Sequence, residues 1–175
     1  MALLLVATCL PATSAQAQTA TADRPDVIYV PTPMAVVDAM LQLAKVTSTD
    51  VIYDLGCGDG RIPVAAARKF GARGVCIDID PERIREADEN IARSGVGDKV
   101  RTVQGDLFQQ PLGEATVVTL YLLDSVNERL LPKLRRELKP GTRIVSHAFR
   151  MGAWAPEQTL TVDGRRLFFW TIPPR

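Results

Sequence analysis

The chain has 175 residues, which is the usual length of one domain. It is 46% hydrophobic and 23% charged, an ordinary globular balance with ample apolar material for one core. The formal net charge of +1 gives no support for general nucleic-acid binding, which needs a surplus of basic residues.

Residues 1–17 have the pattern of a secretory signal peptide. A short apolar run ends at Leu10, Pro11 follows, and small residues lead up to Ala17. The run is too short to span a bilayer as a helix. No Lys or Arg precedes it, so a cytoplasmic protein with an alanine-rich leader is the alternative. We expect export, with cleavage after Ala17 and an extended N-terminal segment over residues 18–32.

Cleavage would leave two cysteines in the mature chain. Cys57 and Cys76 lie in or beside predicted buried strands. Two cysteines do not make the framework of a disulfide-rich domain, so we interpret both as small buried hydrophobic residues.

Helices and strands alternate along residues 33–175. Thr32 resembles an N-cap followed by Pro33 at the first helical position. Helical spacing of apolar residues and helix-stop signals predict helices over 33–46, 62–70, 81–94 and 126–138. Short apolar runs predict strands over 51–54, 74–78, 100–104, 115–123 and 143–149, and the Asp163-Gly164 pair predicts a closing hairpin.

This order of elements predicts the fold class. Strands that alternate with helices form βαβ units with parallel pairing. We therefore expect one doubly wound α/β domain over residues 33–175. Its sheet would have seven strands and be mostly parallel and Rossmann-like, with an antiparallel C-terminal hairpin strand.

Acidic residues stand where the predicted strands end. Asp54 closes the first strand, Asp78 the second, and Asp106 follows the third. Asp80 and Asp124 also follow strands, but each precedes a predicted helix and is better interpreted as its N-cap. In an open α/β sheet the carboxyl ends of the strands form the ligand crevice, so we expect the first three acids to line it.

A glycine-rich turn, Gly56-Cys-Gly58-Asp-Gly60, follows the first strand. Glycines let the backbone turn tightly and approach a ligand closely, and the helix that begins after them points its N-terminus at the pocket. The spacing differs from the dinucleotide fingerprint G-x-G-x-x-G, and acids ahead of and among the glycines would repel a pyrophosphate. They suit a cationic nucleoside without phosphate, such as S-adenosylmethionine (AdoMet).

The sequence at this point resembles the class I AdoMet-dependent methyltransferases. "DLGCGDGRI" is similar to that family's first motif, "GVCIDIDP" to its ribose-binding strand end and "VQGDLF" to its adenine-edge segment. "YVPTP", "TLYLL" and "LKPGTRIVSHAF" resemble small bacterial relatives of the ATP synthase c-subunit lysine N-methyltransferases. The Asn-Pro-Pro-Tyr type of motif found in amide and adenine N-methyltransferases is absent, which lowers the expectation of nucleobase methylation.

The resemblance implies roles for eleven residues and for the partners. The cofactor would be AdoMet, the acceptor a lysine side chain of an unidentified protein, and neither nucleic acid nor a metal is expected. Gly56, Gly58, Asp54 and Asp59 would hold the methionine part, and Tyr29 and Thr32 would close over its carboxylate. Asp78 would bind the ribose hydroxyls and Ile79 the adenine face, Asp106 and Leu107 would line the adenine edge, and Tyr121 would face the acceptor as the catalytic-side residue.

Other functions stay open at this point. A nicotinamide-dependent oxidoreductase is disfavoured by the glycine spacing. A protein that binds AdoMet without catalysis, or that methylates a small molecule, is the main alternative. The leader favours the non-catalytic form, because AdoMet is made in the cytosol. Water or a nearby acid can take the proton that a lysine must lose, so we assign no dedicated base. Tyr121 and His147 also have structural interpretations, as a core tyrosine and a strand-end histidine.

Overall fold

The computed structural model describes residues 29–175, so the predicted signal peptide and most of the predicted extended segment lie outside the described residues. The described elements, in chain order, are α1 (Met34–Leu43), β1 (Val51–Leu55), α2 (Arg61–Phe70), β2 (Arg73–Asp78), α3 (Pro81–Arg93), β3 (Val100–Gln104), β4 (Val117–Leu120), α4 (Asp124–Glu137), β5 (Arg143–His147), β6 (Gln158–Val162) and β7 (Arg165–Thr171).

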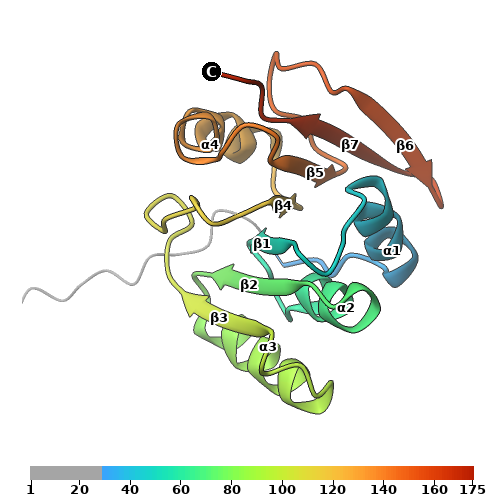
Figure 1. Ribbon diagram of the computed structural model, residues 1–175, viewed down its shortest axis with the longest axis vertical. Helices are drawn as coiled ribbons and strands as arrows, with labels where there is room; N and C mark the ends of the chain where they lie inside the picture. Colours follow the sequence, from blue (N-terminus) through green and yellow to red (C-terminus); the bar gives the residue numbers. More distant parts are fainter. Residues whose placement is uncertain (1–28) are drawn as a thin grey trace, which may run out of the picture.

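The strands form one seven-stranded sheet in the order β3-β2-β1-β4-β5-β7-β6 (Figure 1). The five strands β1 to β5 pair in parallel, β7 is antiparallel to β5, and β6 is antiparallel to β7. This confirms the predicted seven-stranded, mostly parallel sheet with its antiparallel C-terminal hairpin. The chain runs outward from β1 to β3 and then returns to β4 on the other side of β1. The strand order therefore reverses between β1 and β4, which is where such sheets bind ligands.

Helices cover both faces of the sheet, with α1 and α2 on one face and α4 on the other (Figure 1). Because successive strand residues point to opposite faces, neighbours in one strand belong to different cores. Ile52 of β1 packs with α1 and α2, whereas Leu55 of the same strand belongs to the core that contains Leu130 and Leu134 of α4. A further small core joins α2 to α3, so α3 lies on the face of α2.

The hairpin β6–β7 contributes large apolar side chains to the core. Phe168 and Trp170 of β7 are fully buried. The indole N–H of Trp170 donates to the carbonyl of Trp154 at 3.0 Å, and the two indole rings lie 6.0 Å apart. This arrangement satisfies the one polar group of a buried tryptophan.

The helix N-caps in the structure can be compared with those predicted from the sequence. Asp80 is the N-cap of α3, as predicted, because its carboxylate accepts from the amide of Glu82 at 2.8 Å. Two other predictions are wrong. Pro33, not Thr32, is the N-cap of α1, and α4 begins at Asp124 itself, with Leu123 as its N-cap.

The reason for both corrections is a long-range contact. The Thr32 hydroxyl contacts His147, and the Asp124 carboxylate accepts from the backbone amide of Arg150. The strand predicted over 115–123 is also shorter, since Tyr121 and Leu122 leave the sheet and line a cavity.

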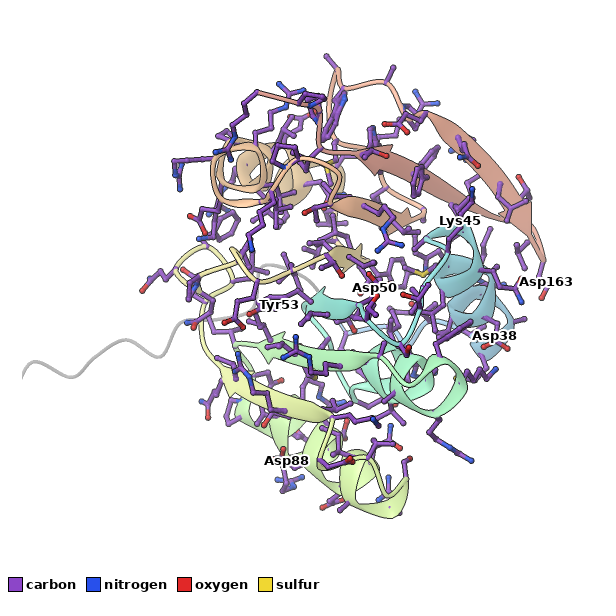
Figure 2. All side chains as sticks on the ribbon, viewed as in Figure 1. Asp38, Lys45, Asp50, Tyr53, Asp88 and Asp163 are labelled. Atoms are coloured by element: carbon purple, nitrogen blue, oxygen red, sulfur yellow. A yellow bond between two sulfur atoms is a disulfide. The ribbon has the colours of Figure 1, made fainter. Side chains whose placement is uncertain are left out.

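Some acids serve the scaffold only. Asp50 lies just before β1 and is bound by the hydroxyl of Thr116 at 2.7 Å and by the guanidinium of Arg143. Figure 2 shows Asp50 near the start of β1, and Asp163 at the tip of the β6–β7 hairpin. Among residues 29–175, no helix has both the length and the apolar character that a membrane span requires.

Candidate functional site

A cavity of about 470 Å³ opens at the carboxyl ends of β1, β2 and β4. Ten of the eleven predicted site residues line it: Tyr29, Thr32, Asp54, Gly56, Asp59, Asp78, Ile79, Asp106, Leu107 and Tyr121. The eleventh, Gly58, is not among the lining residues, but its amide donates to the carboxylate of Asp78, which is, at 2.9 Å. Segments that are far apart in the sequence therefore meet around one space.

The glycine-rich turn follows β1 and bends sharply. Gly56, Gly58 and Gly60 all have positive φ angles, of 76°, 54° and 72°, a conformation that side chains other than glycine rarely adopt. The amides of Gly56 and Cys57 both donate to the carbonyl of Ile77, at 2.8 and 3.1 Å. The turn is thus held against the end of β2, and α2 begins immediately after it.

The same turn is joined covalently to β2. Cys57 and Cys76 are both buried, their Cα atoms lie 5.3 Å apart, and their sulfurs form a disulfide. Our interpretation of the two cysteines as unlinked hydrophobic residues is therefore wrong. Cys57 lies beyond the end of β1, and the glycine turn brings it back onto β2, where its amide donates to Ile77 beside Cys76; a separation of 19 residues in the sequence does not reveal this.

Asp54 stands at the floor of the cavity and is 3% exposed. The hydroxyl of Thr119, on the neighbouring strand β4, donates to its carboxylate at 2.7 Å. Burial raises the pKa of Asp54 to about 7, the Thr119 hydrogen bond opposes this rise, and the nearby charges of Asp78 and Asp59 add to it. A cationic group in the cavity would favour the charged form of this carboxylate.

Two other acids each organise a turn. The carboxylate of Asp78 accepts from the amide of Gly58 and, at 3.0 Å, from the amide of Asp80. Burial raises the pKa of Asp78, although these amide hydrogen bonds work against that rise. Asp106, beyond β3, accepts from the amide of Phe108 at 2.8 Å. Each acid is therefore fixed in place while it faces the cavity.

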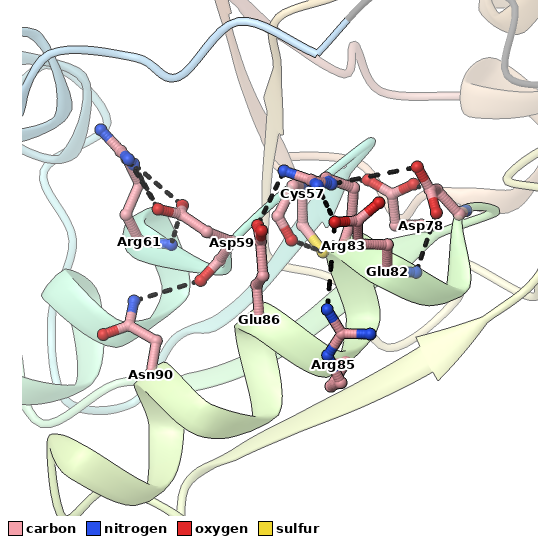
Figure 3. A network of polar contacts seen from close by, with 11 residues as sticks. Cys57, Asp59, Arg61, Asp78, Glu82, Arg83, Arg85, Glu86 and Asn90 are labelled. Carbon is pink, nitrogen blue, oxygen red and sulfur yellow. Dashed lines mark hydrogen bonds and ion pairs between the residues drawn. The ribbon is translucent and has the colours of Figure 1, made fainter.

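A network of charged groups borders the cavity on the α2 and α3 side (Figure 3). The guanidinium of Arg61 binds the carboxylate of Asp59 at 2.6 Å, and Asn90 of α3 donates to the Asp59 carbonyl at 3.1 Å. Burial works to raise the pKa of Asp59, but the hydrogen bonds and charge of Arg61 hold it below its ordinary value. On α3, Arg83 pairs with Glu86 at 2.7 Å.

Residues 29–33, which we call the N-terminal strap, lead into α1, and the first four of them line the cavity. The ring of Tyr29 lies so close to Gly58 that a Cβ atom there would be 2.2 Å from it. The guanidinium of Arg83 lies 4.6 Å from the centre of the same ring. The carbonyl of Thr32 accepts from Arg61 at 2.9 Å. The strap is thus tied to the glycine turn and to the start of α2.

The opposite wall carries Tyr121, which follows β4. Its ring lies 3.8 Å, centre to centre, from the imidazole of His147 at the end of β5, and 6.0 Å from the ring of Phe149. His147 is buried, and burial together with the charge of Arg165 lowers its pKa to about 4.

Sequence reasoning missed several residues that line the cavity. Arg61 and Arg83 are among them, and so is Arg129 of α4, whose guanidinium lies 4.3 Å above the ring of Phe108. Only Arg61 had a local signal, since it directly follows the glycine turn. The contact between Arg129 and Phe108 joins two segments whose spacing in the sequence follows no motif.

The charges of the cavity indicate its ligand class. Five aspartates line it against three arginines, so it favours a cationic ligand over a phosphate. The crevice at the strand reversal, the glycine turn and the acid at the end of β2 together are the features of a nucleoside-binding α/β domain, and the acids among the glycines fit the resemblance to the AdoMet-dependent methyltransferases.

Comparison with known proteins agrees with this class. The family model of the ANTKMT methyltransferase domain matches residues 54–158, and the chain belongs to this family. A protein-lysine N-methyltransferase from Saccharolobus islandicus is 51% identical over 79% of this chain and 87% of its own length. The ATP synthase c-subunit lysine N-methyltransferase of Xenopus laevis is 27% identical over 74% of this chain and 56% of its own length.

A solved structure supports the cofactor. The crystal structure of an RNA methyltransferase from Salinibacter ruber with S-adenosyl-L-homocysteine (AdoHcy) has a TM-score of 0.82 and 56% identity, and the match covers 83% of this chain and 95% of that one. An AdoMet-dependent methyltransferase from Thiobacillus denitrificans, at 21% identity and a TM-score of 0.59, shares the fold over 66% of this chain and 48% of its own. The chain is an AdoMet-dependent methyltransferase.

Proposed function

We propose that the chain transfers a methyl group from AdoMet to the ε-amino group of a lysine in a protein. The observation that carries the proposal is the 51% identity, over 87% of its length, to a relative named as a protein-lysine N-methyltransferase. The surplus of aspartates around the cavity supports it, because both the sulfonium donor and a protonated lysine are cations.

Within this proposal, each wall of the cavity has a part. Asp78 would take the ribose hydroxyls, Asp106 the adenine edge, and Asp54 would face the cationic methionine end. Tyr121 would line the acceptor side. Methyl transfer from a sulfonium is an in-line displacement, so the main task of these residues is to hold nitrogen, methyl and sulfur on one line. A protonated lysine must lose its proton before it attacks the methyl group, and that proton can leave to water.

Calorimetric titration with AdoHcy tests the cofactor half of the proposal. Asp78→Ala removes a partly buried charged acceptor worth about 1.5–3 kcal/mol, so the Kd should rise by about 10- to 100-fold. Asp163→Ala, at the exposed hairpin tip, is the matched control and should leave the Kd unchanged. Unchanged binding in Asp78→Ala would show that this carboxylate does not hold the ribose.

A labelled-methyl assay tests the acceptor half. We would incubate the full chain and methyl-labelled AdoMet with three candidate acceptors in parallel reactions: cell-envelope proteins, cytosolic proteins and total RNA. Label on lysine, identified by mass spectrometry of peptides, is the expected result. Label confined to RNA would reject the lysine acceptor and would extend to this chain the substrate class in the name of the Salinibacter ruber protein.

We also propose that the mature chain works outside the cytosol. The signal-peptide pattern of residues 1–17 supports this, and so does the Cys57–Cys76 disulfide, since disulfides persist mainly in oxidising compartments. Because AdoMet is made in the cytosol, catalysis by an exported chain requires that AdoMet reach the same compartment.

Cell fractionation with thiol alkylation before and after reduction tests this second proposal. We expect the mature chain in the exported fraction, with Cys57 and Cys76 alkylated only after reduction. A full-length cytosolic protein with both thiols freely alkylated would contradict it.

A further inference from the structure

His147 is the single histidine of the chain and is 1% exposed. Its contacts reach different walls of the cavity. Its Nδ1 atom lies 3.2 Å from the hydroxyl of Thr32, in the N-terminal strap, and its ring lies against that of Tyr121 on the acceptor side. Thr32 and Tyr121 both line the cavity, while His147 stands behind them.

The contact with Thr32 continues into the glycine turn. The Thr32 carbonyl accepts from Arg61 at 2.9 Å, and Arg61 binds the carboxylate of Asp59 at 2.6 Å. An unbroken series of contacts therefore runs from Asp59 through the strap to His147 and Tyr121. It joins the part of the cavity predicted for the methionine end of AdoMet to the part predicted for the acceptor.

We propose that His147 is a positioning residue for methyl transfer, which fixes Tyr121 on the acceptor side and Thr32 on the cofactor side in one relative geometry. The physical reason is the in-line requirement, since a misplacement of about 1 Å can lower the rate of such a reaction by roughly 100-fold. This inference rests on methyl transfer and is independent of whether the acceptor is lysine.

The environment of His147 suits positioning and not proton transfer. Burial lowers its pKa to about 4, so the imidazole is neutral under ordinary conditions and keeps one N–H donor and one acceptor nitrogen. It does not line the cavity, so substrate would not touch it. Its hydrogen bond with Thr32 spans 115 residues of sequence and is buried, which fixes the strap more firmly than an exposed contact would.

Nuclear magnetic resonance of the imidazole tests the coupling without any acceptor. Because the chain has one histidine, its ring signals need no assignment. We expect AdoHcy to shift these signals with the Kd that calorimetry gives. Thr32→Val removes the hydroxyl that contacts Nδ1, so the shift that AdoHcy produces in the imidazole signals should shrink in this variant. If AdoHcy binds and the imidazole signals do not move, or if they move as far in Thr32→Val as in the wild type, the proposal is wrong.

Kinetics test the positioning. Thr32→Val removes the hydroxyl, His147→Phe keeps a ring and removes the hydrogen bond, and Thr161→Val on the exposed strand β6 is the matched control. On the acceptor found by the labelled-methyl assay, we expect kcat to fall about tenfold in either variant and by no more in the double variant, since both break one contact. The Kd for AdoHcy should change by less than about threefold in His147→Phe.

The outcomes separate this inference from the proposed function. An additive, roughly 100-fold loss in the double variant would mean that the two residues act independently and would overturn it. So would an unchanged kcat in a folded His147→Phe. Should His147→Phe fail to fold, the kcat of Thr32→Val and its imidazole response to AdoHcy still decide. A wild type that labels no protein contradicts the lysine acceptor alone, and the resonance experiment then decides the coupling.

Discussion

Asp54→Asn should make the ligand-free protein more stable at neutral and alkaline pH. The substitution keeps the oxygen that accepts from Thr119 and removes the charge that burial disfavours. A pKa raised from 3.8 to about 7 corresponds to about 4 kcal/mol of folding free energy. The folded wild type holds a proton that the unfolded chain releases, so this stability is present below about pH 4 and is lost as the pH rises through 7.

The assay is chemical unfolding of both proteins from pH 5 to pH 8 without ligand. Between pH 5 and pH 8 the free energy of unfolding of the wild type should fall by about 2–3 kcal/mol more than that of Asp54→Asn. Contributions from other titrating groups cancel when the two proteins are compared. A difference that does not change with pH would refute the reasoning, because it would mean that Asp54 titrates as in solution. The same substitution should weaken AdoMet binding by about tenfold, since a cation then loses its opposite charge.

Three further outcomes follow from the packing around the cavity and in the core. Gly58→Ala should raise the Kd for AdoHcy at least about tenfold in calorimetry, because its Cβ would meet the Tyr29 ring. Gly164→Ala is the control and should leave this Kd unchanged, since Gly164 also has a positive φ but has open space around it. Trp170→Ala should cost about 3–5 kcal/mol in chemical unfolding, and a loss under about 1 kcal/mol would contradict its place in the core. Tyr121→Ala should lower kcat about tenfold while the Kd for AdoHcy stays within about threefold, and the reverse pattern would move Tyr121 to the cofactor side.

The strands and helices were predictable because their signals are local. The run before Asp54 is buried on both sheet faces, which a parallel strand requires and which a continuous apolar stretch reveals. The ends of elements were less predictable where a capping residue had a distant partner. Thr32 and Asp124 both looked like N-caps, yet their side chains bind residues 115 and 26 positions away.

In the candidate site, too, the features with local sequence signals were predictable and the contacts between distant residues were not. The acids Asp54, Asp78 and Asp106 could be placed around one cavity because parallel strands bring their carboxyl ends to one edge. The contacts between residues on different strands around the cavity could not be predicted in this way. The contact of His147 with Tyr121, and the disulfide of Cys57 with Cys76, depend on which strands become neighbours, and no local pattern encodes that order.

The disulfide has a consequence for how tightly the empty site can hold its ligand. A turn with three glycines at positive φ is conformationally free, and ordering it on binding would consume part of the interaction energy. The link from Cys57 to Cys76 imposes that order before the ligand arrives. The chain thereby has a preorganised receptor for AdoMet, an advantage that grows as the cofactor becomes scarce.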